Sequence, residues 1–324
     1  MKTDYEIKSI KDAIRIIEEL NCDNVFLGKI DKSSFPYGIF YRGQSNSEYS
    51  LTPSVFRNIN LQGSSEYHSY ALSEQEIFRN AQRKFRYSAR ESDRQLYELF
   101  DWLCVLQHYD IPTRLLDWTE NIAVALYFAV STDNTGRHCD KDAKLLILNA
   151  RSLNSISGHE KSRNNLNTTD SFGVKLRTTM IISNTRESWR KLWVKDYDDI
   201  RWRDEQGGPL DESDFATPIA VLPNYLNQRM FLQSCLFTLH GGKLHNGLLD
   251  KKIDKSSLPL PISLEKINSE QIKMGKPPII IEAIIPSIYK EKIARELSYL
   301  GIHPGTIRPE LEYQASYFKR KLMT

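Results

Sequence analysis

The chain has 324 residues, of which 40% are hydrophobic and 26% are charged. This balance is typical of a folded globular protein and excludes a disordered or membrane-embedded chain. The formal net charge is only +3, from 44 basic and 41 acidic side chains, so no global positive field indicates nucleic acid binding. A local basic groove is compatible with these numbers.

The first twenty residues contain acidic side chains in every apolar run, so they resemble neither a signal peptide nor a transit peptide. No stretch approaches the roughly 20 apolar residues that a membrane-spanning helix needs. We therefore expect a cytoplasmic protein without a membrane partner. The four cysteines have no C-x-x-C spacing, so we expect no metal site and no disulfide framework.

The periodicity of apolar residues divides the first half of the chain into helices and one strand. In chain order it predicts a helix over residues 7–19, a strand over 38–43, and helices over 73–87, 93–108 and 120–131. Residues 1–36 thus form a mainly helical N-terminal part. The helix over 120–131 is so densely apolar that we expect it to be buried nearly all round.

Short strands and polar loops alternate in the second half. The predicted elements are strands over residues 144–149, 218–222, 236–240 and 279–285, helices over 224–232 and 288–300, and polar loops over 154–170 and 251–276. These elements follow one another without a regular βαβ rhythm. We therefore expect a single α+β domain over residues 1–324, with a mixed sheet and flanking helices.

The first group of candidate functional residues follows the strand at 38–43. Arg42 presents a guanidinium whose fixed fork of donors matches a phosphate or pyrophosphate. Gly43 permits the close approach of a ligand or of another backbone, and Gln44 and Ser45 supply further polar groups. The alternative is that Arg42 forms a structural ion pair.

The second group lies in residues 106–129, where a helix ends, a turn carries Thr113 and Arg114, and the apolar helix follows. Asp117 or Thr119 is expected to cap that helix, because short side-chain oxygens accept bonds from its first amides. The alternative for Asp117 is an ion pair with Arg114 or Arg42.

Two aromatic rings in the same segment have two interpretations each. Trp118 either packs in the core or stacks on a base or nicotinamide ring. His108 is either a general base or a histidine held by structural hydrogen bonds.

The third group is Arg229 and Gln233, which are four residues apart and share one face of the predicted helix over 224–232. They point together into a cleft or lie on a solvated surface. The sequence alone leaves both interpretations open.

The three segments, in this order and at these spacings, resemble the FRG domain family, which is named for an aromatic-Arg-Gly motif. Tyr41-Arg42-Gly43 fits that motif, and residues 106–129 fit its second block almost letter for letter. Ser234-Cys235 departs from the Gln-Gly usual in the third block. The resemblance covers roughly residues 7–317 and implies a bacterial protein, because FRG domains are often found near phage defence and toxin genes.

The first motif also resembles the Tyr/Phe-Arg-Gly in the first strand of arginine-type ADP-ribosyltransferases. This resemblance implies an ADP-ribosyltransferase-like fold that binds NAD, with the pyrophosphate on Arg42. Trp118 or Tyr127 would flank the nicotinamide, and Asp117 and Gln233 would join Arg42 in catalysis. Such enzymes carry a glutamate ahead of a late strand, for which this chain offers only Gln233, Glu282, Glu310 or Glu312.

The cofactor residues implied in that interpretation are Tyr41, Arg42, Gly43, Gln44, His108, Thr113, Arg114, Trp118, Tyr127 and Arg229. NAD would be the cofactor, and a protein or nucleic acid the acceptor of ADP-ribose. One alternative is a sensing module that binds a nucleotide or phosphate through Arg42, Arg114 and Arg229 without catalysis. A further alternative is a nuclease-like toxin that uses His108, Asp117 and an arginine. The sequence does not fix the oligomeric state.

Overall fold

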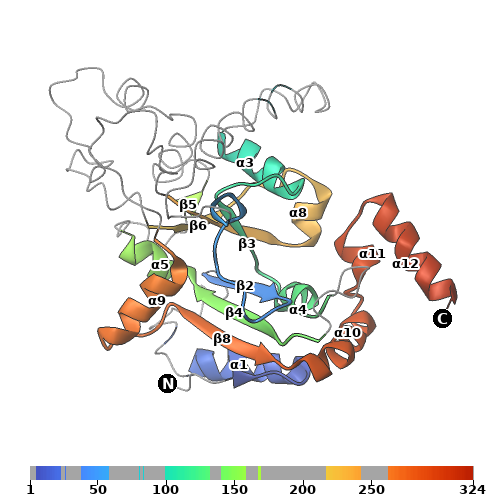
Figure 1. The fold of residues 1–324 in the computed structure, drawn as a ribbon, viewed down its shortest axis with the longest axis horizontal. Coiled ribbons are helices and arrows are strands. Elements are labelled where there is room, and N and C mark those ends of the chain that lie inside the picture. Colours follow the sequence, from blue (N-terminus) through green and yellow to red (C-terminus); the bar gives the residue numbers. More distant parts are fainter. Residues whose placement is uncertain are drawn as a thin grey trace.

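The computed structural model describes residues 5–22, 26, 38–57, 80, 83, 99–131, 140–157, 167–168, 217–241 and 262–323. The strands of these residues form one mixed sheet in the order β1-β8-β4-β2-β3-β7-β6-β5 (Figure 1). Their bounds are Tyr5–Glu6 (β1), Ile39–Gln44 (β2), Leu115–Thr119 (β3), Ala143–Asn149 (β4), Asn167–Thr168 (β5), Ile219–Leu222 (β6), Cys235–Leu239 (β7) and Ile280–Ile285 (β8). The predicted α+β class is therefore confirmed.

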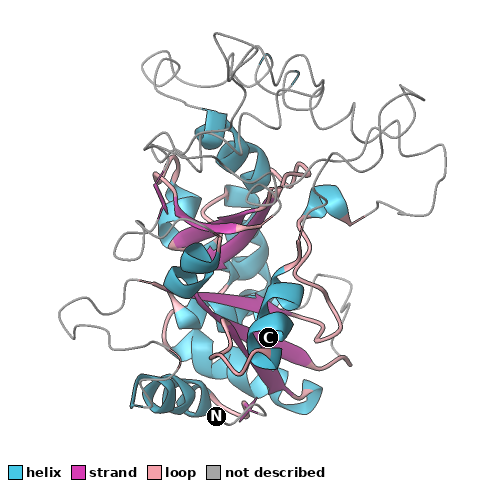
Figure 2. Cartoon of the chain, turned by 90° about the vertical axis from the view of Figure 1, so that its left-hand side faces the viewer, coloured by secondary structure: helices cyan, strands magenta, loops and turns pink. Residues whose placement is uncertain are grey.

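The sheet is weakly joined at its centre. β2 and β4 pair over six residues and β3 and β7 over five, but β2 and β3 pair only through Tyr41 and Thr119. Figure 2 shows the strands in two groups, which correspond to β1-β8-β4-β2 and β3-β7-β6-β5. The two halves diverge beyond this single pair, and the divergence leaves room for side chains between β2 and β3.

Helices cover the sheet on both faces. Their bounds are Ile10–Cys22 (α1), Leu99–His108 (α3), Ile122–Val130 (α4), Ala150–Ile156 (α5), Gln228–Leu232 (α8), Leu264–Lys273 (α9), Lys290–Tyr299 (α10), Pro304–Ile307 (α11) and Leu311–Met323 (α12). Short 3₁₀ turns lie at Ser54–Phe56 and Ser287–Tyr289.

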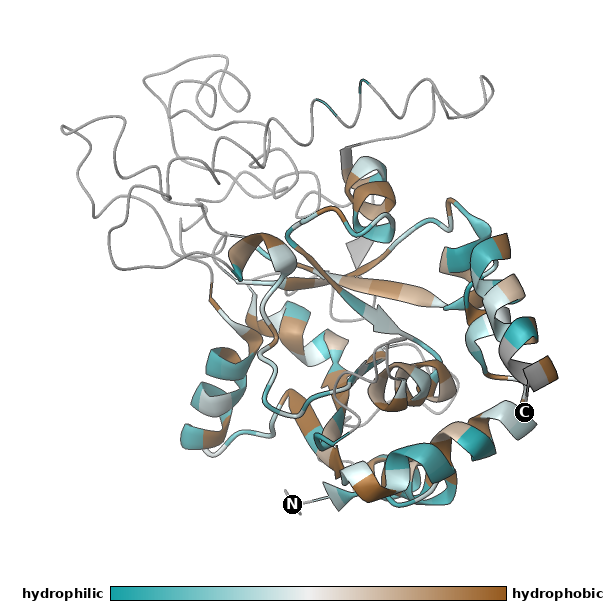
Figure 3. Cartoon of the chain, turned by 45° about the vertical axis from the view of Figure 1, so that its right-hand side comes forward, coloured by the Kyte–Doolittle hydropathy of each residue, from teal (hydrophilic) through white to brown (hydrophobic). Residues whose placement is uncertain are grey.

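Three apolar clusters hold these layers together. One packs α1, α4 and α10 against the first half of the sheet, and a second packs α3 and α8 against the other half. The third joins strands of both halves to α5 and α9. In Figure 3 the strands are mostly hydrophobic, whereas the C-terminal helix α12 carries many hydrophilic residues.

The predicted buried helix is α4, and its cap differs from our expectation. Asn121 caps it by accepting a bond from the amide of Ala123 at 2.9 Å. Asp117 and Thr119 do not cap it because both belong to β3. Thr119 instead donates to the carbonyl of Gln233 at 2.6 Å, a bond that ties β3 to the end of α8.

The predicted loop over residues 154–170 is wrong in its first part, where α5 ends at Ile156. Asn154 is fully buried and brackets the backbone of Ala220, accepting from its amide at 2.7 Å and donating to its carbonyl at 3.0 Å. Asn154, whose polarity favoured the loop prediction, therefore satisfies the backbone hydrogen bonds of Ala220 in β6. Residues 167–168 form β5, and residues 158–166 and 169–170 lie outside the described residues.

The predicted loop over 251–276 is also wrong in its second part, because α9 occupies Leu264–Lys273. Ser263 caps this helix, and only Leu264 and Ile267 are buried from it. These two apolar residues, one turn apart, are enough to dock α9 against the core, although the polar composition of the helix resembles that of a loop. Residues 251–261 lie outside the described residues.

The remaining predicted elements agree with the structure to within a few residues. The first helix begins later than predicted, at Ile10, because β1 precedes it and pairs in parallel with β8. The helix predicted over 73–87 lies almost wholly outside the described residues. No helix in the described ranges is long and apolar enough to cross a membrane.

Candidate functional site

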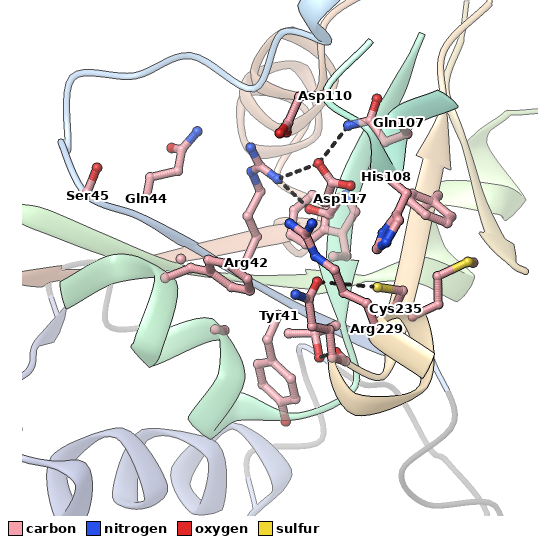
Figure 4. Close-up of a pocket in the computed structure, with 18 of the residues that line it drawn as sticks. Tyr41, Arg42, Gln44, Ser45, Gln107, His108, Asp110, Asp117, Arg229 and Cys235 are labelled. Carbon is pink, nitrogen blue, oxygen red and sulfur yellow. Dashed lines mark hydrogen bonds and ion pairs between the residues drawn. The ribbon is translucent and has the colours of Figure 1, made fainter. Parts of the chain in front are cut away.

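A cavity of about 580 Å³ opens where β2 and β3 separate. Its walls come from β2 and the loop after it, from α3, β3, α4 and α8, and from Arg308 near the C-terminus. Figure 4 shows Arg42 reaching the cavity from β2 and Arg229 reaching it from α8. The volume is in the range of pockets that bind small ligands.

Arg42 bridges the gap between the two halves of the sheet. Its Nη1 donates to the backbone carbonyl of Asp117 at 2.6 Å and lies 3.8 Å from the Asp117 carboxylate. The same carboxylate accepts from Nε2 of Gln107 at 2.8 Å. Asp117 is therefore held from both sides, although its side chain is still 51% exposed.

Gly43 permits α4 to cross β2 at very short range. A Cβ at this position would lie 1.9 Å from the carbonyl oxygen of Ala125 and 2.6 Å from the amide nitrogen of Ala129. Gly43 is therefore required by another backbone, one of the two partners that the sequence predicted. The same crossing brings Ala125 and Phe128 of α4 to the wall of the cavity.

A second ionic group lies around Arg229. Its Nη1 is 3.4 Å from Oε1 of Glu310, and Nε2 of His108 is 4.0 Å from the same oxygen. Burial, with a smaller contribution from Arg229, lowers the pKa of His108 to about 4, although Glu310 and Asp110 oppose the shift. His108 is therefore neutral at pH 7, and Arg229 is the cation that Glu310 faces.

Four arginines line the cavity: Arg42, Arg57, Arg229 and Arg308. Burial lowers the pKa of Arg42, and Arg57 lowers it as well, while Asp117 raises it. Arg42 and Arg57 therefore repel one another, and arginine remains charged in proteins. A buried cation is costly unless it is fully paired, so this group favours an anionic ligand.

Several buried polar atoms at or beside this cavity also indicate a ligand. Among the described residues, no hydrogen-bond partner is present for the buried Nε atoms of Arg42, Arg229 and Arg308, nor for Oε1 of Gln44 and Oε2 of Glu310. These five atoms combine three donors and two acceptors. Buried polar atoms are rarely left without a partner in native proteins. A ligand with phosphate oxygens and hydroxyl groups would satisfy both kinds.

The structure brings together most of the residues that the sequence singled out. Of the predicted catalytic and cofactor residues, those that line the cavity are Tyr41, Arg42, Gly43, Gln44, His108, Asp117, Trp118, Arg229 and Gln233. Arg42, Asp117 and Gln233 thus lie in one pocket, as each function considered from the sequence requires. Their roles in binding or catalysis remain predictions.

Three predicted cofactor residues do not line the cavity. Thr113 donates to Oε1 of Gln107 at 2.5 Å, and Arg114 is buried with its Nη1 3.2 Å from the carbonyl of His240. Tyr127 packs in the apolar cluster beneath α4 and does not flank the cavity. Their side chains hold the walls in place. The contacts of Thr113, Arg114 and Tyr127 with a bound ligand remain predictions.

Trp118 and Gln233 line the cavity, but their polar groups form hydrogen bonds with other parts of the protein. The indole of Trp118 is buried and donates to Oγ1 of Thr238 at 3.0 Å, so it packs in the core. Nε2 of Gln233 donates to the carbonyl of Ile307 at 3.1 Å. This bond attaches the segment before Arg308 to α8.

Cys235 also reaches the wall, next to Gln233. Burial raises the pKa of its thiol to about 12, so the thiol stays protonated and unreactive at pH 7. Burial likewise raises the pKa of Tyr41 to about 12. Neither group is poised to act as a base at neutral pH.

The sequence did not single out several wall residues, including Arg57, Tyr49, Asp110 and Arg308. Arg57 lies beyond the first group of candidate residues, and Arg308 lies two residues before Glu310. No local pattern marks either arginine as part of the cavity. Asp110 has a φ of +58°, a conformation uncommon outside glycine, and no local pattern marks it.

In the described residues, no three His, Cys, Asp or Glu side chains are grouped as a metal site would require.

Comparison with known families identifies the part of the chain that builds most of this cavity. Residues 38–138 match the family model of the FRG domain, so this part of the chain is an FRG domain. The match includes β2, α3, β3 and α4, but Arg229 and Arg308 lie beyond it. No curated protein and no solved structure matches the chain.

Proposed function

We propose that the cavity of this FRG domain protein binds NAD through its phosphate groups and cleaves the bond between nicotinamide and ribose. The protein would then act as an ADP-ribosyltransferase or an NAD glycohydrolase. Consumption of NAD would suit a toxin or defence effector, the setting that the family resemblance implies. The observation that carries the proposal is the convergence of four arginines on one cavity.

Arginine suits the pyrophosphate of NAD for two reasons. Its guanidinium donates two parallel bonds to phosphate oxygens, and it keeps its charge when buried. Arg42 and Arg57 come from the FRG domain, whereas Arg229 and Arg308 come from later segments. A ligand with two linked phosphates can contact both groups at once.

The chemistry needs negative charge near the ribose. When the glycosidic bond breaks, its electron pair moves to the nicotinamide nitrogen, so nicotinamide leaves neutral and the ribose carbon becomes cationic. Water or an acceptor hydroxyl then bonds to that carbon and loses its proton. Fixed charges that stabilise the cationic carbon account for much of the catalysis in such reactions.

Asp117 and Glu310 are the carboxylates best placed for that role. Asp117 lines the cavity beside Arg42, and Glu310 faces Arg229 with a buried Oε2 that has no partner among the described residues. Glu282, another glutamate considered from the sequence, lies 3.6 Å from Lys144. Neither Glu282 nor Glu310 lines the cavity itself, but Glu310 contacts Arg229, which does. Glu312 is exposed on α12.

The test is to incubate the purified chain with NAD and follow nicotinamide by chromatography, with thermal shift in parallel. We expect release that Arg42→Ala abolishes. Arg295→Ala is the matched control, because Arg295 is a 63% exposed arginine on α10. Release that persists in Arg42→Ala would contradict the proposal.

A second candidate is a sensor that binds a nucleotide without cleaving it. Its specific support is that Gln233 is engaged with Ile307 and that Asp117 is already paired with Arg42 and Gln107. In this case NAD or ADP would raise the melting temperature of the native chain, but nicotinamide would not be released. The same experiment therefore separates the two candidates.

A further inference from the structure

The loop from Ser45 to Arg57 forms one wall of the cavity and is fixed before any ligand arrives. It is anchored to β2, to the turn before β4, to the segment before β3, and to α10. The bonds are Gln44 Nε2 to Ser50 O at 3.2 Å, Ser47 N to Asp142 O at 2.7 Å, Val55 N to Thr113 O at 3.2 Å and Lys290 Nζ to Ser45 O at 2.7 Å. A wall ordered in advance loses little conformational entropy on binding.

Tyr49 is the aromatic residue that this wall presents. It lines the cavity, and 44% of it is exposed. Its amide donates to the carbonyl of Asn46 at 3.2 Å, so it sits in a tight turn of the loop. An exposed aromatic ring at the edge of a polar cavity offers its face to a flat ligand group.

The position of Tyr49 complements that of the arginines. Gln44 Nε2 donates to the carbonyl of Ser50, the residue after Tyr49, so the backbone of Tyr49 lies close to Gln44. Figure 4 shows Gln44 and Ser45 on the opposite side of Arg42 from His108 and Arg229. Arg57, which closes the loop, lines the same cavity as Arg42. Tyr49 and the four arginines thus line one cavity, so a molecule whose phosphates contact the arginines can reach Tyr49.

We propose that Tyr49 is the surface on which the aromatic base of the bound molecule stacks, so that the site selects a nucleoside diphosphate group over bare pyrophosphate. This inference rests on the proposed nucleotide function and names the residue that recognises the base. Stacking needs only the face of a ring, so it accepts different bases. The arginines supply the phosphate affinity, and Tyr49 supplies the preference for a nucleotide.

Isothermal titration of the full chain with ADP and with inorganic pyrophosphate, in phosphate-free buffer, tests this assignment. We expect the native chain to bind ADP more tightly than pyrophosphate. Tyr49→Leu should weaken ADP binding by about tenfold, a typical effect of losing one base stack, and leave pyrophosphate binding unchanged. Tyr49→Phe keeps the ring and should bind ADP as the native chain does.

The pyrophosphate titration also shows whether each variant is folded and the arginine site intact. Equal losses for both ligands in Tyr49→Leu would overturn the inference, and so would no loss for either. Native binding of pyrophosphate with no preference for ADP would refute the role of Tyr49 while leaving the phosphate site standing. Failure of the native chain to bind either ligand would refute the proposed function as well.

Discussion

Replacing Gly43 by alanine should force α4 away from β2 and damage the binding site. The added Cβ would lie 1.9 Å from one backbone atom of α4, 2.6 Å from a second and 2.9 Å from a third, and contacts under 3.0 Å essentially never occur. The two backbones must therefore separate by about 1 Å. Over-packing costs ~1–3 kcal/mol, and we expect the upper end because backbone atoms cannot rotate aside.

Urea unfolding followed by circular dichroism measures this loss, and titration with ADP measures its effect on the site. Gly275→Ala is the control, because a Cβ there meets nothing within 4 Å, although its φ of +70° costs about 1 kcal/mol. We expect that control to keep native ADP affinity. If Gly43→Ala unfolds at the same urea concentration as the native chain and binds ADP with native affinity, then the close crossing of α4 over β2 does not require glycine at this position.

Three further predictions concern ionisable groups in or beside the cavity. Arg42→Ala should weaken ADP binding at least tenfold, by loss of a charge-assisted phosphate contact, without lowering the melting temperature by more than a few degrees; global unfolding would refute it. Glu310→Gln should reduce nicotinamide release at least tenfold with NAD affinity little changed, whereas Glu312→Gln should behave as the native chain. Stability should fall as the pH drops from about 6.5 to about 4, because the unfolded chain then protonates His108 while the folded chain, with its lowered pKa, does not. His108→Gln should make this acid loss smaller in urea titrations, and an unchanged loss would contradict the assignment.

The elements that the sequence predicted well are those with dense apolar residues. α4, β4 and β8 are buried on most of their surface, so their composition alone marks them. α5 and α9 were missed because each docks through one or two apolar residues and begins with a polar cap, at Asn149 and Ser263. A cap followed by an apolar residue is a helix signal that overall polarity conceals.

The candidate site was predicted in part for a related reason. Arg42 stands near the end of the predicted strand over 38–43 and Arg229 lies in the predicted helix over 224–232, whereas Asp117 lies in β3, which the periodicity did not predict. Thr113 and Arg114 lie just before β3, and the turn directs them inward, toward Gln107 and His240. Local pattern does not give that direction, because it depends on how α3 packs against β3 and β7.

Arg57 and Arg308 could not be assigned from local pattern at all. They lie some 250 residues apart in the sequence and meet only because α11 returns the chain to the cavity after β8 and α10. Gln233 fixes that return by its bond to the carbonyl of Ile307, next to Arg308. Such convergence follows from the order of strands in the sheet, which periodicity does not reveal.

The alternation of side chains along β2 explains why the Tyr-Arg-Gly motif combines folding with binding. Successive residues of a strand point to opposite faces. Tyr41 joins the apolar cluster beneath α4, and Gly43 on the same face leaves room for the backbone of that helix. Arg42 lies between them and points the other way, across the gap to Asp117. Because the neighbours of Arg42 fix the strand, its own side chain can be removed at little cost to the fold, and loss of ADP binding in Arg42→Ala can then be attributed to the site itself.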